Sequence, residues 1–140
     1  MSDGWPHVDT PFHAGEQEVQ ERLGVRDIED WARKVVRPYL PEEHRAFHSA
    51  IPFLIAAAQD ADGRPWATLL TGPDGFVTSP DPYSLVIGAK PAPGDALEGA
   101  LLRGADFGIL GIEFATRRRN RANGRLVDGD PSTLVFAVDQ

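Results

Sequence analysis

Short strand-like segments separated by tight turns fill the chain from residue 52 onward, and this spacing constrains the fold more than any other feature. Phe53–Gln59 and Pro65–Thr71 flank the turn sequence DADG, a pattern typical of a β-hairpin. Further short strands are expected around a GPDG turn and beyond it, in Phe76-Val77, Ser84–Gly88, Ala105–Phe114 and Leu134–Val138. Many short strands at such intervals favour an antiparallel sheet that is closed, or nearly closed, into a barrel.

Helical patterns gather near the N-terminus, after an arm of residues 1–14 that lacks apolar periodicity. Helices are expected over Gly15–Leu23, Asp27–Val36 and Pro41–Ser49, and Pro38 ends the second of them. A later helix is expected over Asp95–Leu102. The sequence therefore predicts an α+β fold, with residues 15–140 forming one domain built on the barrel.

Five arginines lie within nine residues, in the stretch RRRNRANGR (Arg117–Arg125), although the formal net charge of the chain is −7. Without them, nine basic residues remain against 21 acidic residues, a balance of −12. Such a negative surface repels nucleic acid and anionic lipid. The arginine cluster therefore suits a small anion better than a polyanion, and we expect neither nucleic acid nor membrane as a partner.

Several functional classes have no support in the sequence. The chain contains no cysteine, which excludes disulfides and thiolate metal sites. Its apolar runs are far shorter than the ~20 residues of a membrane-spanning helix, and no signal-peptide pattern opens it, so a cytoplasmic protein is expected. His44 and His48 have helical i, i+4 spacing, but no third ligand accompanies them and no metal site is expected. No motif for nucleophilic hydrolysis is present, and Glu113 is expected to face outward at a strand end.

The dipeptide Asn123-Gly124 predicts a two-residue turn that would fold the arginine strand back on the residues after it. Pairing across this turn would place Arg119 opposite Asp128 and Arg117 opposite Asp130. Such cross-strand ion pairs would contribute roughly 0.2–1 kcal/mol each.

Strand alternation would place Arg117, Arg119 and Arg121 on one face of the sheet, with Arg118 and Asn120 on the other. Surface ion pairs leave several of these arginines without partners. The alternative is an anion site that uses at least one of them, since guanidinium groups bind phosphate oxygens through parallel hydrogen bonds.

The segment GRPWATLLTG (Gly63–Gly72) offers features of the other half of a ligand site. Trp66 would supply an aromatic wall, Thr68 and Thr71 hydroxyl groups, and Gly72 a position where a planar group approaches the backbone. We expect this strand to face the arginine strand across a slot.

Three motifs occur in order along the chain: FHAGE (Phe12–Glu16), GRPWATLLTG, and LGIEFATRRRNRANGR (Leu110–Arg125). Together they resemble the pyridoxamine 5′-phosphate oxidase-like flavoproteins, split β-barrels that bind FMN at a homodimer interface. The resemblance runs from about Phe12 to the end of the chain. It implies that the cofactor is FMN and that its contacts are Trp66, Ala67, Thr68, Leu69, Thr71 and Gly72, with Arg119 most directly and Asn120 and Arg121 beside it.

The sequence also departs from the family pattern. The usual basic residue near Thr68 is absent, and Lys90 is the only basic residue between Arg64 and Arg103. This argues against oxidation of pyridoxamine phosphate itself. The family's C-terminal segment is not matched either, so a short version of the domain is expected.

Three functions follow from these features. The first is an FMN-dependent oxidoreductase that acts on a small molecule, with reduced nicotinamide or a reductase as electron donor. The second is a flavin-binding or dimerisation module without turnover. The third is a barrel without cofactor whose arginines are paired with aspartates.

Overall fold

The computed structural model describes residues 4–140, apart from the side chains at positions 128 and 129. The chain divides into two compact units, with the boundary between Pro38 and Tyr39. The boundary expected at residue 14 therefore lies inside the first unit, because the first two helices pack with the arm that precedes them. No helix in the described part of the chain is both long enough and apolar enough to cross a membrane.

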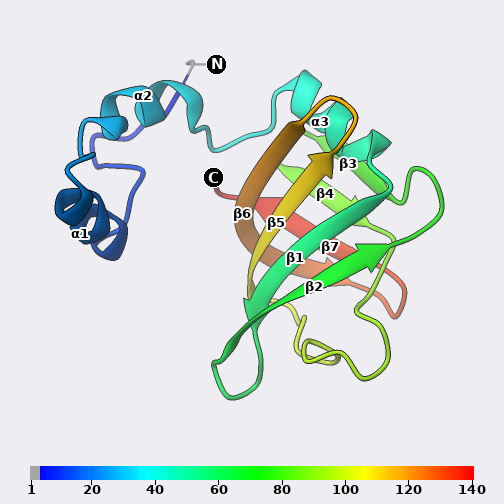
Figure 1. Cartoon of the computed structure of the whole chain (residues 1–140). Coiled ribbons are helices and arrows are strands. Elements are labelled where there is room, and N and C mark those ends of the chain that lie inside the picture. The colour runs from blue at the N-terminus through cyan, green and yellow to red at the C-terminus, as the bar shows by residue number, and fades with distance from the viewer. Residues whose placement is uncertain (1–3) are drawn as a thin grey trace. The chain divides into compact units, whose positions relative to one another are not determined.

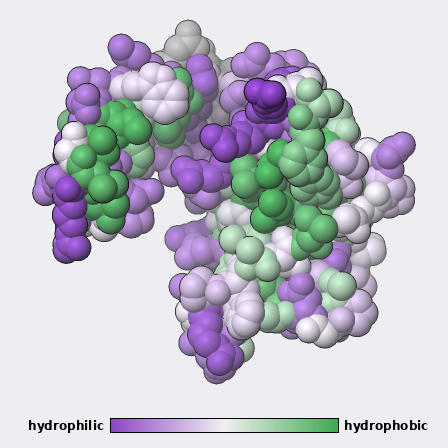
Figure 2. Space-filling model, viewed as in Figure 1, coloured by the Kyte–Doolittle hydropathy of each residue, from purple (hydrophilic) through white to green (hydrophobic). Residues whose placement is uncertain are grey.

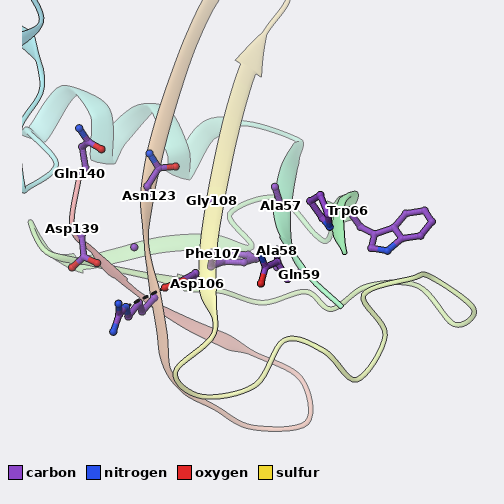
Figure 3. Close-up of a pocket in the computed structure, with 13 residues that line it drawn as sticks. Ala57, Ala58, Gln59, Trp66, Asp106, Phe107, Gly108, Asn123, Asp139 and Gln140 are labelled. Carbon is purple, nitrogen blue, oxygen red and sulfur yellow. Dashed lines mark ion pairs between the residues drawn. The ribbon is translucent and has the colours of Figure 1, made fainter. Parts of the chain in front are cut away.

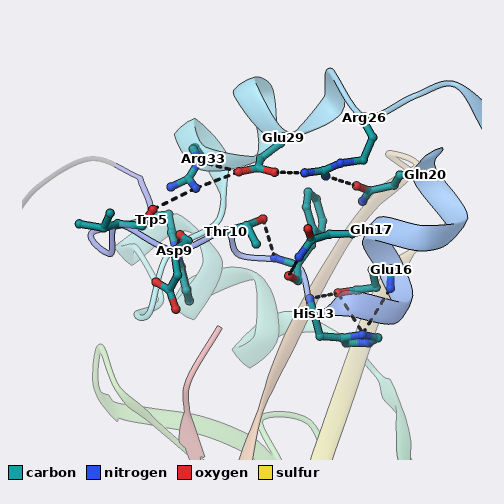
Figure 4. A network of polar contacts seen from close by, with 12 residues as sticks. Trp5, Asp9, Thr10, His13, Glu16, Gln17, Gln20, Arg26, Glu29 and Arg33 are labelled. Atoms are coloured by element: carbon teal, nitrogen blue, oxygen red, sulfur yellow. Dashed lines mark hydrogen bonds and ion pairs between the residues drawn. The ribbon is translucent and has the colours of Figure 1, made fainter.

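The first unit contains helices α1 (Ala14–Leu23) and α2 (Ile28–Val35). His13 and Glu16 form a reciprocal capping box at the start of α1. The Glu29 carboxylate accepts hydrogen bonds from the guanidinium groups of Arg26 and Arg33, as Figure 4 shows. The hydrogen bond from Arg26 is the main cause that lowers the pKa of Glu29. Ala32 is buried in this unit. Polar contacts thus organise much of the first unit.

The second unit carries helix α3 (Glu42–Ala50) and one seven-stranded antiparallel sheet. Its strands are β1 (Phe53–Gln59), β2 (Pro65–Thr71), β3 (Val77–Asp81), β4 (Ser84–Ile87), β5 (Asp106–Glu113), β6 (Arg118–Gly129) and β7 (Leu134–Val138). Their spatial order is β2-β1-β5-β6-β7-β4-β3, and the sheet curls on itself (Figure 1). The two end strands, β2 and β3, are not paired with each other in the described residues. The α+β fold with an open, split antiparallel barrel is confirmed.

The hydrophobic core lies on the inner side of the curled sheet. Alternate residues of each strand point inward, as the period of two requires. The fully buried side chains include Leu54, Leu70, Leu85, Ile87, Leu97, Leu126 and Phe136. Every residue of the core cluster comes from positions 40–138, that is, from the second unit.

The β1–β2 hairpin has the expected turn, which begins at Asp60. The Asp60 carboxylate accepts from the backbone N–H groups of Asp62 and Arg64 and from the Trp66 indole. The backbone bond from Arg64 is the largest of the causes that lower the pKa of Asp60 to about 2. Local hydrogen bonds therefore stabilise the turn of this hairpin.

The turn predicted at Asn123-Gly124 is wrong, because both residues lie inside the continuous strand β6. The backbone N–H of Asn123 donates to the carbonyl of Gln140 (2.7 Å), and its carbonyl accepts from Asp139 (2.9 Å). The chain reverses earlier, at residues 114–117, where Arg117 has a left-handed φ of 59°.

Both predicted ion pairs are therefore wrong. Arg119 and Asp128 are nine positions apart on one strand, roughly 30 Å at the rise of an extended chain. The side chain of Asp128 itself lies outside the described residues. The Asp130 carboxylate accepts from Ser132 and Thr133 instead of meeting Arg117.

The helix predicted over Asp95–Leu102 is also wrong, since these residues form successive turns. Gly99 has a φ of 76°, a left-handed conformation that interrupts a helix. The Asp95 carboxylate accepts from the backbone of Leu97 and from the hydroxyl of Thr68, and Leu97 and Leu101 are buried. This segment is held by its contacts with the barrel.

Candidate functional site

The outer face of β2, β1, β5 and β6 brings the two predicted halves of the site onto one surface. Strand register aligns Leu69 with Ile55, Ile55 with Leu110, and Leu110 with Arg121. A parallel row starts at Ala67 and passes through Ala57 and Gly108 to Asn123. Each row thus runs from β2 across apolar strands to the polar residues of β6.

Apolar side chains dominate the middle of this face, which we call the outer sheet face. Leu69 is 56% exposed, and Ile55 and Leu110 are half-buried. Phe114 is 76% exposed and lies 5.8 Å from the Phe53 ring, centroid to centroid. Figure 2 shows hydrophobic residues gathered over this part of the sheet. An exposed patch of this kind typically marks a binding surface.

Within one chain the tryptophan strand and the arginine strand do not face each other across a slot, although Trp66 and Arg125 line a common cavity described below. β2 and β6 belong to the same sheet and are separated by β1 and β5, a distance of roughly 14 Å at normal strand spacing. Trp66 also lies on the side of the sheet opposite Leu69, and its indole donates to Asp60 (3.0 Å). Figure 3 shows the Trp66 ring directed away from β6.

The structure divides the residues expected to contact the cofactor between the two sides of the sheet. Those on the outer sheet face are Ala67, Leu69, Thr71, Arg119 and Arg121. On the inner side, the buried Thr68 donates a hydrogen bond to Asp95. Asn120, on the same side, is hydrogen-bonded to His48. Gly72 lies beyond the end of β2, where an added Cβ would come within 2.7 Å of Phe76, so close packing requires this glycine. Whether these residues contact a cofactor stays a prediction.

The alternation predicted for Arg119 and Arg121 against Arg118 and Asn120 is correct, whereas Arg117, predicted on the face of Arg119, lies in the turn before β6. Arg119 and Arg121 align with Ile112 and Leu110 on the outer sheet face, whereas Ala122 is buried. Among the described side chains, neither arginine has a carboxylate within ion-pairing distance. Arg125 does, since its Nε lies 3.1 Å from Asp106. Two exposed guanidinium groups therefore border the apolar face.

Helix α3 supports β6 from the inner side. The His48 Nε2 donates to the Asn120 Oδ1 over 2.8 Å, and burial lowers the pKa of His48, so its imidazole is neutral. The neighbouring Phe47 ring lies under the Arg118 guanidinium, 5.2 Å from centroid to Cζ. The sequence predicts no metal site at His48, but it does not identify Asn120 as the partner of His48. An added Cβ at Gly111 would meet Phe47 at 2.8 Å, so this glycine allows α3 to approach the sheet closely.

A cavity with a volume of about 500 Å³ opens at the opposite end of the sheet. Trp66 and Arg125 both line it, together with Asp106 and Asp139 (Figure 3). Because two carboxylates line this cavity and its arginine is already paired with one of them, it offers no free positive charge to an anion.

Glu113 is half-buried at the end of β5 and accepts a hydrogen bond from Thr116, in place of the outward position expected for it. Among the described residues, no group of three or more side chains is arranged to hold a metal ion.

No family model matches the chain, and no curated protein matches it. Among solved structures, the fold is similar to that of a tagged variant of HupZ from Group A Streptococcus, with a TM-score of 0.51 and 14% sequence identity. The match covers 72% of this chain and 96% of the HupZ chain. At this identity the likeness concerns the fold alone, and it agrees with the split barrel described above.

Proposed function

We propose that this protein is a flavoprotein that binds FMN on the outer sheet face, where a second copy of the chain covers the flavin. The observation that carries this proposal is the position of Arg119 and Arg121, which border an exposed apolar surface and have no described carboxylate partner. FMN is a flat ring system with a phosphate tail. A face that offers both aliphatic contacts and guanidinium groups matches both of its parts.

Strand β2 adds backbone hydrogen-bonding groups to the guanidinium donors of Arg119 and Arg121. It is the end strand of the sheet, so half of its N–H and C=O groups have no strand partner. Ala67, Leu69 and Thr71 point outward beside that free edge. Polar edges of the flavin ring would bind there without any further charged side chain.

The homodimer follows from the same surface. A self-complementary patch buried by a two-fold axis is the commonest way in which a chain covers an exposed apolar face. Leu69, Phe114 and the half-buried Phe53 would be covered by such an interface. Two sheets packed in this way would create the slot that a single chain lacks.

Bound FMN would supply two-electron transfer, and the protein would hold and orient it. Arg119 and Arg121 would place positive charge beside the ring or its phosphate. The substrate would be a small molecule, and the electron donor would be reduced nicotinamide or a reductase partner. The alternative is a flavin carrier without turnover.

The test is reconstitution of the purified protein with FMN, followed by flavin fluorescence. Replacement of Arg119 by alanine is expected to weaken FMN binding by ~1–3 kcal/mol, because one charge-assisted hydrogen bond is lost. Arg125→Ala is the matched control, since it removes the same charge from a residue already paired with Asp106.

A colourless protein that takes up no FMN would contradict the proposal. The remaining hypothesis would then be a barrel without cofactor. If FMN binds, anaerobic bleaching by NADH or NADPH would identify an enzyme, and a stable yellow colour under the same conditions would identify a carrier. Sedimentation of the FMN-bound protein as a monomer would contradict the dimer.

A further inference from the structure

A second cavity lies between helix α3 and the start of β6, and Arg119 belongs both to its lining and to the outer sheet face. Its volume is about 300 Å³, and it is lined by His44, Phe47, Arg117, Arg118, Arg119 and Asn120. Figure 1 places the β5–β6 turn beside α3, which brings these residues together from positions more than 70 apart in sequence. We call this cavity the α3 pocket.

The α3 pocket concentrates positive charge that the described side chains do not neutralise. Arg117, Arg118 and Arg119 are consecutive, and no described carboxylate forms an ion pair with any of them. Like charges held this close repel one another, and a bound anion relieves that repulsion. Arg117 also has a left-handed φ of 59°, a conformation that costs a non-glycine residue on the order of 1 kcal/mol and is often found at binding sites.

Two contacts hold hydrogen-bond donors of the pocket in position without a ligand. The Phe47 ring holds the Arg118 guanidinium at 5.2 Å by a cation–π contact. The buried His48 occupies the Oδ1 atom of Asn120, which leaves the amide N–H₂ of Asn120 as a donor without a partner among the described residues. The lining thus offers guanidinium and amide hydrogens, all of which are donors.

Neighbouring carboxylates pair with other residues than the three arginines, and Glu43 lies 3.7 Å from the Nε2 of His44. Glu113 stands opposite Arg118 in the strand register, but the hydrogen bond that it makes is with Thr116. Glu42 is paired with Arg45 at 2.8 Å. These two acids therefore form no ion pair with the arginines of the pocket.

We propose that the α3 pocket binds the phosphate group of a phosphomonoester. Such a group carries a charge of about −1.5 to −2 at neutral pH and presents three acceptor oxygens, which suit neighbouring guanidinium forks. The volume lies at the lower end of the range of about 300–1,000 Å³ for small-molecule sites, so it accommodates the phosphate and a short organic group. The phosphate belongs either to FMN or to a separate small molecule.

The proposal is tested with the full chain by titration with inorganic phosphate at constant ionic strength, monitored by calorimetry and by NMR signals of the arginine side chains. Saturable binding is expected. Arg117→Gln and Arg118→Gln are each expected to weaken it about tenfold or more, the loss for one charge-assisted hydrogen bond. Arg125→Gln, which removes the same charge outside the pocket, should leave the affinity within about twofold, as for a rim charge at high dielectric.

Absence of saturable phosphate binding would overturn the proposal, and so would an equal loss in the Arg125 control. Circular dichroism of each variant shows whether the fold is retained. Arg118→Gln also removes the contact of Arg118 with Phe47. Arg117→Gln leaves that contact in place and therefore provides a second, independent variant.

Competition experiments distinguish the two sources of phosphate without depending on the proposed flavin function. If phosphate competes with FMN but not with riboflavin, the pocket holds the cofactor's phosphate. If phosphate binds and FMN is unaffected or does not bind, the pocket serves a separate phosphomonoester, for which phenyl phosphate is the probe. Failure of FMN binding therefore leaves this site standing, and failure of phosphate binding leaves the outer sheet face standing.

Discussion

His48 is a buried imidazole whose two nitrogens have different surroundings. Its Nε2 donates to Asn120, and its Nδ1 has no hydrogen-bond partner in the described structure. Protonation of Nδ1 would place a charge in the protein interior, and for this reason burial lowers the pKa of His48 below 6.5. The residue is thus adapted to the neutral form.

This burial makes stability depend on pH in a defined direction. Because the folded-state pKa lies below the unfolded value of 6.5, the unfolded chain takes up a proton first as the pH falls. The free energy of unfolding should therefore decrease from pH 6.5 down to the folded-state pKa. His48→Gln should flatten this slope, as measured by urea unfolding at several pH values.

An NMR titration of the His48 ring gives the decisive check. A pKa at or above 6.5 in the folded protein would contradict the assignment. Asp60 and Asp130 cannot produce the same slope, because their pKa values of about 2 lie below their usual 3.8, and the stability that they contribute is lost only as the pH falls from 3.8 toward 2.

At the scale of elements, β6 depends on the absence of a side chain at Gly124. An added Cβ would lie 1.8 Å from the Ala137 carbonyl oxygen on β7. This atom belongs to the backbone, so it moves only if the two strands separate. Gly124→Ala is expected to destabilise the protein by about 3 kcal/mol or more, measured by chemical unfolding.

Gly108→Ala is the matched control on the neighbouring strand. Its Cβ would meet only the end of the Asn123 side chain, at 3.1 Å, which can move aside. A loss of about 1 kcal/mol or less is expected. Equal losses in the two variants would show that close backbone approach is not the cause.

Local chemistry and long-range pairing explain which elements the sequence predicts. The β1–β2 hairpin was predictable because Asp60 bonds to the turn that follows it. Asn123-Gly124 carries the same kind of local signal, yet its backbone is bonded to β5 on one side and to the C-terminal residues on the other. Long-range pairing overrides turn preference there, and a single sequence does not contain that information.

The difference between local patterns and long-range contacts also explains which parts of the candidate site could be predicted. Alternation along β6 placed Arg119 and Arg121 on one face correctly, because it depends only on strand geometry. The partners of Arg118 and Asn120 come from α3 and could not be predicted, since no local pattern connects residues 71 and 72 positions apart. The edge position of β2 is likewise a property of the whole sheet.

At the scale of the molecule, the hydrophobic core lies entirely within the second unit. A chain restricted to residues 39–140 should therefore fold by itself, with a free energy of unfolding within about 1 kcal/mol of that of the whole chain. Limited proteolysis between the units, followed by circular dichroism and urea unfolding of the larger fragment, measures this. A fragment without secondary structure would show that the first unit is needed for the barrel.

The second half of β6 has strand neighbours on both sides. Gly124 is aligned with Phe107 on β5 and with Val138 on β7, and Arg125 with Asp106 and Ala137. The β2-β1-β5 portion and the β7-β4-β3 portion of the sheet are therefore joined through a few shared peptide groups. Neither portion can come apart without disturbing the other, so the barrel should melt in one cooperative, two-state step.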